Sequence, residues 1–91
     1  MKNIEKYNTK VRQAISSEYR RCNKQKAEYE REFEVLAMKL ANEGGTLTHN
    51  QYLKISDDAE YLRRRIEELS IELDTWDKAR EICLNIAYEI L

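Results

Sequence analysis

Apolar residues recur along the chain at alternating steps of three and four residues, in two long segments. In the first segment this stripe consists of Ile4, Tyr7, Val11, Ile15, Tyr19, Cys22, Tyr29, Phe33, Leu36 and Leu40, with Lys26 in its one gap. In the second segment it consists of Ile55, Ala59, Leu62, Ile66, Leu69, Leu73, Trp76, Cys83, Ala87 and Ile90, with Arg80 in the gap. Such spacing places apolar side chains on one face of a helix and is typical of packed or coiled helices, whereas a half-buried strand alternates at every second residue. The pattern predicts two long helices and no strand.

The two stripes are separated by the stretch ANEGGTLTHNQY at positions 41–52, which holds both glycines of a chain without proline. Gly44 or Gly45 is expected to end the first helix in the left-handed conformation. Thr48 and Gln51 have the spacing of a capping box, and Leu47 and Tyr52 have the spacing of a hydrophobic staple. We therefore expect one domain over residues 1–91, an all-α antiparallel hairpin with helices at about 3–43 and 48–90.

Charge supports the antiparallel arrangement. Residues 1–26 have a net charge of +6 and residues 67–91 a net charge of −5, so a fold about residue 45 lays opposite charges side by side. The same fold brings Glu28, Glu30 and Glu32 level with the arginines at 63–65. Exposed ion pairs contribute only a few tenths of a kcal/mol each, so this pattern is expected to select topology and register more than to stabilise.

Composition limits the classes of protein to which the chain can belong. Charged residues make up 36 % of the 91 positions, and a chain this short buries a small share of its surface, for which self-association commonly compensates. No run of eighteen apolar residues is present and the segment MKNIEKYNTK has no apolar core of a signal peptide, so we expect no membrane association and a cytoplasmic location. Cys22 and Cys83 are interpreted as small buried hydrophobic residues, about 22 Å apart along a simple hairpin and therefore unbridged.

The end of the second helix is apolar on more than one face. Residues 82–91, ICLNIAYEIL, contain more apolar side chains than one partner helix covers. The residues expected to form an interface with a second copy are Trp76, Ile82, Ile86 and Ile90, which would give a dimeric four-helix bundle or coiled coil. Fraying of the terminal turns is the alternative reading of this segment.

The basic first helix is the second candidate surface. The residues that would contact an anion or a nucleic acid are Tyr19, Arg20, Arg21, Lys24, Lys26 and Arg80. The acidic block and the net charge of −1 favour internal neutralisation of these cations instead. Lys26 and Arg80, the two cations within the stripes, either receive an anionic group or set the register of the seam.

No motif for catalysis, metal binding or a cofactor is found, since the chain lacks a glycine-rich phosphate loop, a Ser/His/Asp set and a Cys/His cluster. The sequence therefore predicts a non-enzymatic, self-associating interaction module. We expect an adaptor, or a regulator or inhibitor of a larger protein, of the kind that phages and mobile elements often encode. Nucleic-acid or nucleotide binding through the tyrosine-containing first helix is the alternative function.

Overall fold

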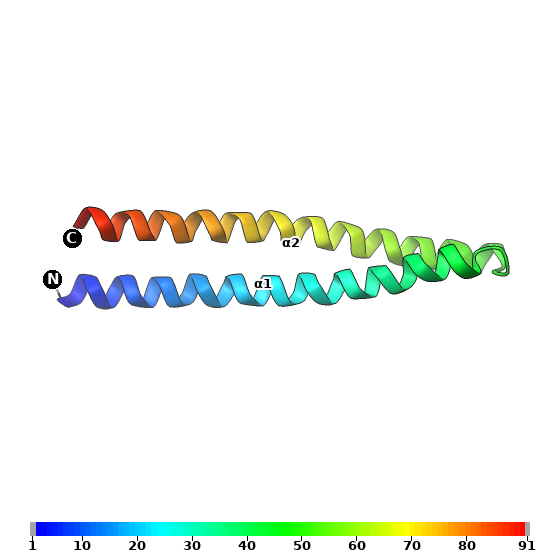
Figure 1. Cartoon of the computed structure of the whole chain (residues 1–91), viewed down its shortest axis with the longest axis horizontal. Helices are drawn as coiled ribbons and strands as arrows, with labels where there is room; N and C mark the ends of the chain where they lie inside the picture. The colour runs from blue at the N-terminus through cyan, green and yellow to red at the C-terminus, as the bar shows by residue number, and fades with distance from the viewer. Residues whose placement is uncertain (1, 91) are drawn as a thin grey trace.

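The computed structural model describes the backbone of residues 2–90 and the side chains of residues 9–83. Helix α1 spans Lys2–Glu43 and helix α2 spans His49–Ile90, 42 residues each. The helices lie side by side and antiparallel, so that the start of α1 and the end of α2 are at the same end of a rod (Figure 1). The rod measures 67 × 16 × 15 Å. The predicted all-α hairpin is confirmed, and no described residue belongs to a strand.

The predicted stripes form the seam between α1 and α2. Between residues 9 and 83 the buried side chains are all apolar and all from the stripes: Ile15, Cys22, Ala59, Leu62 and Leu69. The other described stripe residues are half-buried, except for Arg80, which is exposed. Heptad spacing produces this result because it returns a side chain to the same face of the helix at every second turn. Stripe positions 4, 7, 87 and 90 lie outside the described side chains.

The capping box at the start of α2 is confirmed. The backbone N–H of Gln51 donates to Thr48 Oγ1 at 3.2 Å, and the backbone N–H of Thr48 donates to Gln51 Oε1 at 3.0 Å. Two N–H groups near the helix start therefore acquire partners that the helix itself does not provide. Leu47, which precedes the cap, is half-buried.

The prediction of a left-handed glycine at the end of α1 is wrong. Neither glycine has a positive φ in the described chain. The helix instead ends through hydrogen bonds from the Gly44 N–H to the Leu40 carbonyl at 3.1 Å and from the Thr46 N–H to the Glu43 carbonyl at 2.9 Å. Gly44 is required for a different reason, because a Cβ at this position would lie 2.4 Å from the Leu40 carbonyl oxygen. At Gly45 an added Cβ meets nothing within 4 Å.

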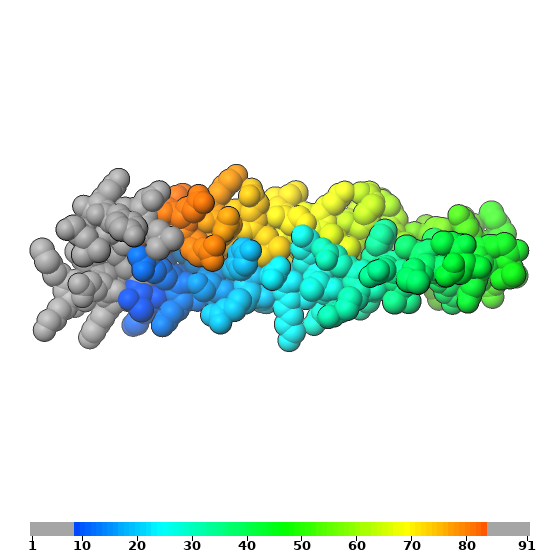
Figure 2. Space-filling view, viewed as in Figure 1, coloured from blue at the N-terminus to red at the C-terminus, as the bar shows by residue number. Residues whose placement is uncertain are grey.

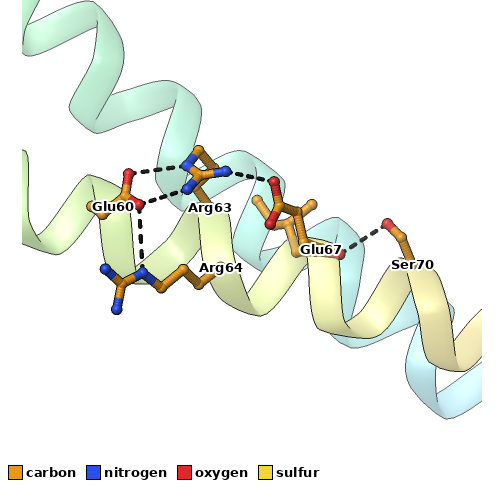
Figure 3. Close-up of polar contacts among 6 residues, drawn as sticks. Glu60, Arg63, Arg64, Glu67 and Ser70 are labelled. Atoms are coloured by element: carbon orange, nitrogen blue, oxygen red, sulfur yellow. Dashed lines mark hydrogen bonds and ion pairs between the residues drawn. The ribbon is translucent and has the colours of Figure 1, made fainter.

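Most ion pairs among the described side chains join residues of the same helix. Arg63 pairs with Glu60 at 2.6 Å and also with Glu67, and Arg64 pairs with Glu60 at 3.4 Å (Figure 3). Arg65 pairs with Glu68. The arginines at 63–65 therefore bind carboxylates one turn away on α2, and not the glutamates of α1. A helix holds side chains three or four residues apart within reach of each other, so these local pairs form without further ordering of the chain.

The ion pair between Arg21 and Glu72 joins the two helices, with Arg21 Nη2 3.1 Å from Glu72 Oε1. The Arg65 guanidinium lies over the Tyr29 ring, 5.8 Å from its centroid. In both contacts the midpoint of the two residue numbers is near 47, whereas the sequence analysis expected the chain to fold back about residue 45. The register of the two helices therefore differs from the expected one. Cys22 consequently lies beside Glu72, about one helical turn from the expected level at position 68. Within the described residues, neither helix has an apolar stretch long enough to cross a membrane.

Candidate interaction surface

Among the described residues, the hairpin leaves more large apolar side chains in water than it buries. Five apolar side chains are buried in this part of the chain, and two of them, Ala59 and Cys22, are small. Seven large ones are exposed among the described residues: Val35, Met38, Tyr52, Leu53, Tyr61, Ile71 and Ile82. Two helices packed along one seam shield only one stripe each, and apolar residues off the stripe therefore remain in contact with water. Figure 2 shows this single-layer packing, in which the two helices lie against each other along the rod.

Two of the exposed residues lie at the edge of an apolar groove. The groove has a volume of about 480 Å³ and is lined by Tyr29, Glu32, Val35 and Leu36 of α1 and by Asp58, Tyr61 and Leu62 of α2. Val35 is 65 % exposed and Tyr61 is 59 % exposed, whereas Leu62 forms the buried floor. The carboxylates of Glu32 and Asp58 belong to the same lining. The groove therefore has an apolar centre and a polar edge, a combination that is also found in protein interfaces.

Tyr29 is held in place within the groove. Gln25 Nε2 lies 3.2 Å from the Tyr29 hydroxyl, and the Arg65 guanidinium covers the ring. The hydrogen bond from Arg65 to Glu68 raises the pKa of the guanidinium, and the nearby Tyr29 raises it further. An aromatic ring fixed from two sides loses little conformational freedom when a partner binds, which favours its use in recognition.

The opposite side of the seam carries a polar depression of about 320 Å³. Its lining residues are Tyr19, Asn23, Lys26, Ser70, Leu73, Asp74 and Asp77. Arg80 stands beside it, over the Tyr19 ring at 5.5 Å from the centroid. The structure therefore brings the two predicted seam cations to the same side of the hairpin. Each has a carboxylate on its own helix, Lys26 with Glu30 at 3.5 Å and Arg80 with Asp77 at 3.1 Å.

A third cluster surrounds Cys22 in the middle of the seam. The thiol is fully buried, and the Arg21 Nη2 lies 3.5 Å from its sulfur. Burial raises the pKa of the Cys22 thiol, and the neighbouring Glu72 carboxylate raises it further. The pKa of Glu72 is lowered, first by the Cys22 thiol and also by Arg21. Cys83 is half-buried, and both cysteines are free, as predicted. A buried thiol with a raised pKa is a poor nucleophile, so Cys22 serves packing.

Two buried side-chain nitrogens have no hydrogen-bond partner within the described chain. These are Arg12 Nε and Trp76 Nε1. Trp76 is half-buried at a seam position. Its indole N–H helps to lower the pKa of Glu72 but lies outside hydrogen-bonding geometry, and we therefore treat it as unpartnered. Trp76 is thus only partly covered at its seam position, and its place in an interface with a second copy stays a prediction.

The other predicted interface residues divide into two groups. Ile82 is 58 % exposed, and its place in an interface stays a prediction. The side chains of Ile86 and Ile90 lie outside the described residues. The sequence analysis missed Val35 and Tyr61, although a signal was available. Both are apolar residues directly before the stripe residues Leu36 and Leu62, so the apolar surface is widened at that level.

The predicted anion-binding residues are dispersed and mostly engaged. Arg20 Nε donates to the Ser16 carbonyl at 3.3 Å, and Arg21 bridges Glu18 and Glu72. Lys24 is exposed. Among the described residues, no group of three or more His, Cys, Asp or Glu side chains is arranged to hold a metal ion.

Comparisons with protein-family models, with curated proteins and with solved structures give no match for this chain.

Proposed function

We propose that this chain is a non-enzymatic protein–protein interaction module that self-associates in the cytoplasm and acts as an adaptor, or as a regulator or inhibitor of a larger protein. The observation that carries the proposal is the reversed distribution of apolar residues, with seven large side chains exposed against five buried ones in the described part. Soluble monomers avoid contiguous apolar surface, and a groove with exposed Val35 and Tyr61 at its edge is such a surface.

The total exposed area supports the same proposal. The chain exposes 7313 Å². A compact protein of the same mass, 10.9 kDa, exposes about 5,600 Å². The excess of roughly 1,700 Å² on one chain is about twice the 800 Å² that each partner buries in an interface of standard size. Packing against a second helical surface would remove about half of this excess without a change in the fold of the hairpin.

The non-enzymatic part of the proposal follows from how the charged groups are used. Four of the six described groups with perturbed pKa values owe the shift first to a neighbour one turn away, as Glu60 does beside Arg63, whereas Cys22 and Glu72 are perturbed by burial and by each other across the seam. The one-turn ion pairs are largely open to water and balanced in charge, and they are not held in an enclosed pocket where a substrate loses its water. An arrangement of this kind supports recognition of a surface more than chemistry on a small molecule.

The proposal is tested by sedimentation equilibrium and light scattering over a range of protein concentrations. We expect a mass of at least twice the 10.9 kDa of the chain, with dissociation on dilution. Circular dichroism measured on the same samples reports whether the helices persist on dissociation. A chain that stays at 10.9 kDa at high micromolar concentration would remove self-association from the proposed function.

Nucleic-acid binding remains the competing proposal for the basic first helix, because Lys24 and Arg20 are exposed on it. A complex that depends on phosphate contacts weakens steeply as salt rises, and each neutralised contact lowers that slope by about one. We expect no complex with single-stranded or duplex oligonucleotides at physiological salt. A salt-sensitive complex at micromolar concentration, weakened by Lys24→Ala, would favour the nucleic-acid function instead.

A further inference from the structure

We propose that the groove face is the self-association surface, and that two hairpins pack through it about a two-fold axis parallel to the rod, with both turns at the same end. The groove face is defined here by the apolar groove and by the residues that continue it along the rod at steps of seven. This inference rests on the proposed self-association and adds the surface and the geometry. Its occupant is a second copy of this chain.

Steps of seven residues trace the groove face, because two turns of a packed helix bring a side chain back to the same side. On α1 the row from the groove residue Val35 continues through Glu28 and Arg21 to Ala14. On α2 the row from Tyr61 continues through Glu68 and Thr75 to Ile82. Every residue in both rows is exposed. A second row on α2 starts at Asp58 and continues through Arg65, Glu72 and Ala79.

The level of each residue along the rod follows from the observed contacts between the helices. Arg21 is level with Glu72 at 3.1 Å, and Tyr29 is level with Arg65. A residue of α1 and a residue of α2 therefore lie at the same height along the rod when the midpoint of their numbers is near 47. A two-fold axis parallel to the rod places α1 of one copy over α2 of the other without changing height. Each residue of α1 then faces the α2 residue of the second copy that is at its own level in the hairpin.

Under this operation the apolar residues of the groove face meet apolar residues. Val35 faces Tyr61 of the second copy, so the exposed ring of each chain covers the groove of the other. Near the open end of the rod, Ala14 faces Ala79 of the second copy. Val11 faces Ile82 there in the same way. These facing pairs are all centred within about one residue of position 47.

The charged residues between these apolar ends are complementary under the same operation. Arg21 faces Glu72 of the second copy, and Glu28 faces Arg65 of the second copy. Within one chain, Arg65 pairs with Glu68 on its own helix. Glu28 and Arg65 therefore do not pair with each other within one hairpin, but they would pair between the two copies. Complementary charges at this position fix the register and orientation of the two hairpins.

Packing with the turns at opposite ends is less complementary. With α1 against α1 of the second copy and the rods fully overlapped, Glu28 would face the level of Arg21, but Glu32 would face the level of Glu18. With α2 against α2 of the second copy, Asp58 and Lys54 would face the apolar level of Ile82. Unpaired charges placed against apolar side chains lose water without gaining a partner, which disfavours this arrangement.

The face is large enough for a stable dimer. A surface of 67 by 16 Å has a projected area of roughly 1,000 Å² on each copy. Stable interfaces bury about 800 Å² on each partner. Two hairpins overlapping along their whole length form a four-helix bundle with the seams of both chains inside it.

A charge exchange between Glu28 and Arg65 tests the arrangement. Each of Glu28→Lys and Arg65→Glu creates two repulsive contacts in a symmetric dimer, and each is expected to weaken self-association about tenfold or more. An equimolar mixture of the two variants restores opposite charges at both contacts. We expect the mixture, measured by sedimentation equilibrium, to return to within a few-fold of the wild-type dissociation constant as a heterodimer. The matched controls are Glu34→Lys and Arg64→Glu, exposed positions outside the groove face, which should leave the constant unchanged.

The outcomes separate this inference from the proposed function. A monomeric wild type would refute self-association itself. A dimeric wild type with both variants equally dimeric would overturn the groove face while leaving the function in place. Rescue of Glu28→Lys by Arg21→Glu, and not by Arg65→Glu, would show that the turns lie at opposite ends. Circular dichroism of each variant checks that the helices remain formed, because Glu28 is exposed but Arg65 is half-buried and covers the Tyr29 ring.

Discussion

Replacing Gly44 by alanine tests how α1 ends. The added Cβ would lie 2.4 Å from the Leu40 carbonyl oxygen, whereas Cβ contacts in proteins essentially never fall below 3.0 Å. Relief requires the turn to move away from the oxygen that now accepts the Gly44 N–H at 3.1 Å. Loss of that hydrogen bond costs about 1 kcal/mol, and backbone distortion adds a similar amount. The reduced freedom of the unfolded chain offsets about 0.4–1 kcal/mol. Gly44→Ala should therefore lower the free energy of unfolding by about 1–2 kcal/mol.

Gly45→Ala is the matched control, with the opposite expected sign. An added Cβ at Gly45 meets nothing within 4 Å, and the residue has no positive φ. The unfolded-state effect then acts alone, and the variant should be unchanged or up to about 1 kcal/mol more stable. For a domain of this length the two variants should differ in melting temperature by at least about 6 °C.

The measurement is thermal unfolding followed by circular dichroism, with all proteins at one concentration because association shifts the transition. A Gly44→Ala protein that melts at or above the temperature of Gly45→Ala would refute the steric account of the turn. It would mean that α1 ends by a different route, with the Leu40 carbonyl free to move.

Three further perturbations address the cap, the seam and the local ion pairs. Thr48→Ala should lower the free energy of unfolding by about 1 kcal/mol in urea titrations, and an unchanged midpoint would mean that the capping box contributes nothing. Leu69→Ala should lower the free energy of unfolding by about 2–5 kcal/mol, because the Leu69 side chain is 2 % exposed. Ile71→Ala, at a position that is 69 % exposed, should change it by no more than about 0.5 kcal/mol. Equal losses of stability in the two variants would contradict the seam. Hydrogen bonds from Arg63 hold the pKa of Glu60 at about 2, below its ordinary 4.5. Because this pKa is lower in the folded protein, the pair of Glu60 with Arg63 stabilises the fold above pH 4.5, and this stabilisation is lost as the pH falls toward 2. Glu60→Gln should therefore make the melting temperature decline less steeply between pH 4.5 and pH 2. If the decline is the same in the variant, this ion pair is not its source.

The sequence by itself determined the hairpin, because the information for it is local. A step of three or four residues repeats the helical period, so Ile15, Cys22, Leu62 and Leu69 were recognisable as one side of their helices before their partner was known. The capping box depends on residues three apart, Thr48 and Gln51, and its two hydrogen bonds are the ones that this spacing predicts.

Only the tertiary structure decided the register of the two helices and the conformation of the turn. A heptad stripe repeats every seven residues and is nearly unchanged by a slip of one turn, so the pattern alone did not distinguish a centre at residue 45 from one near residue 47. The contact of Arg21 with Glu72 settles it. The glycines likewise permitted a left-handed end, but whether the chain uses that freedom depends on where the Leu40 carbonyl and the next helix come to lie.

The charges and the groove show the same division. The sequence indicated that opposite charges would lie side by side, yet Arg63 and Arg64 bind Glu60 because a partner one turn away is already in place, whereas a partner on α1 depends on the register. The groove depends on two helices at once: Val35 and Tyr61 are separated by 26 positions, and their side chains line one surface only after the hairpin has closed. A single helix contains the period of its own buried face, but a surface shared by two helices exists only when their distance and register are fixed.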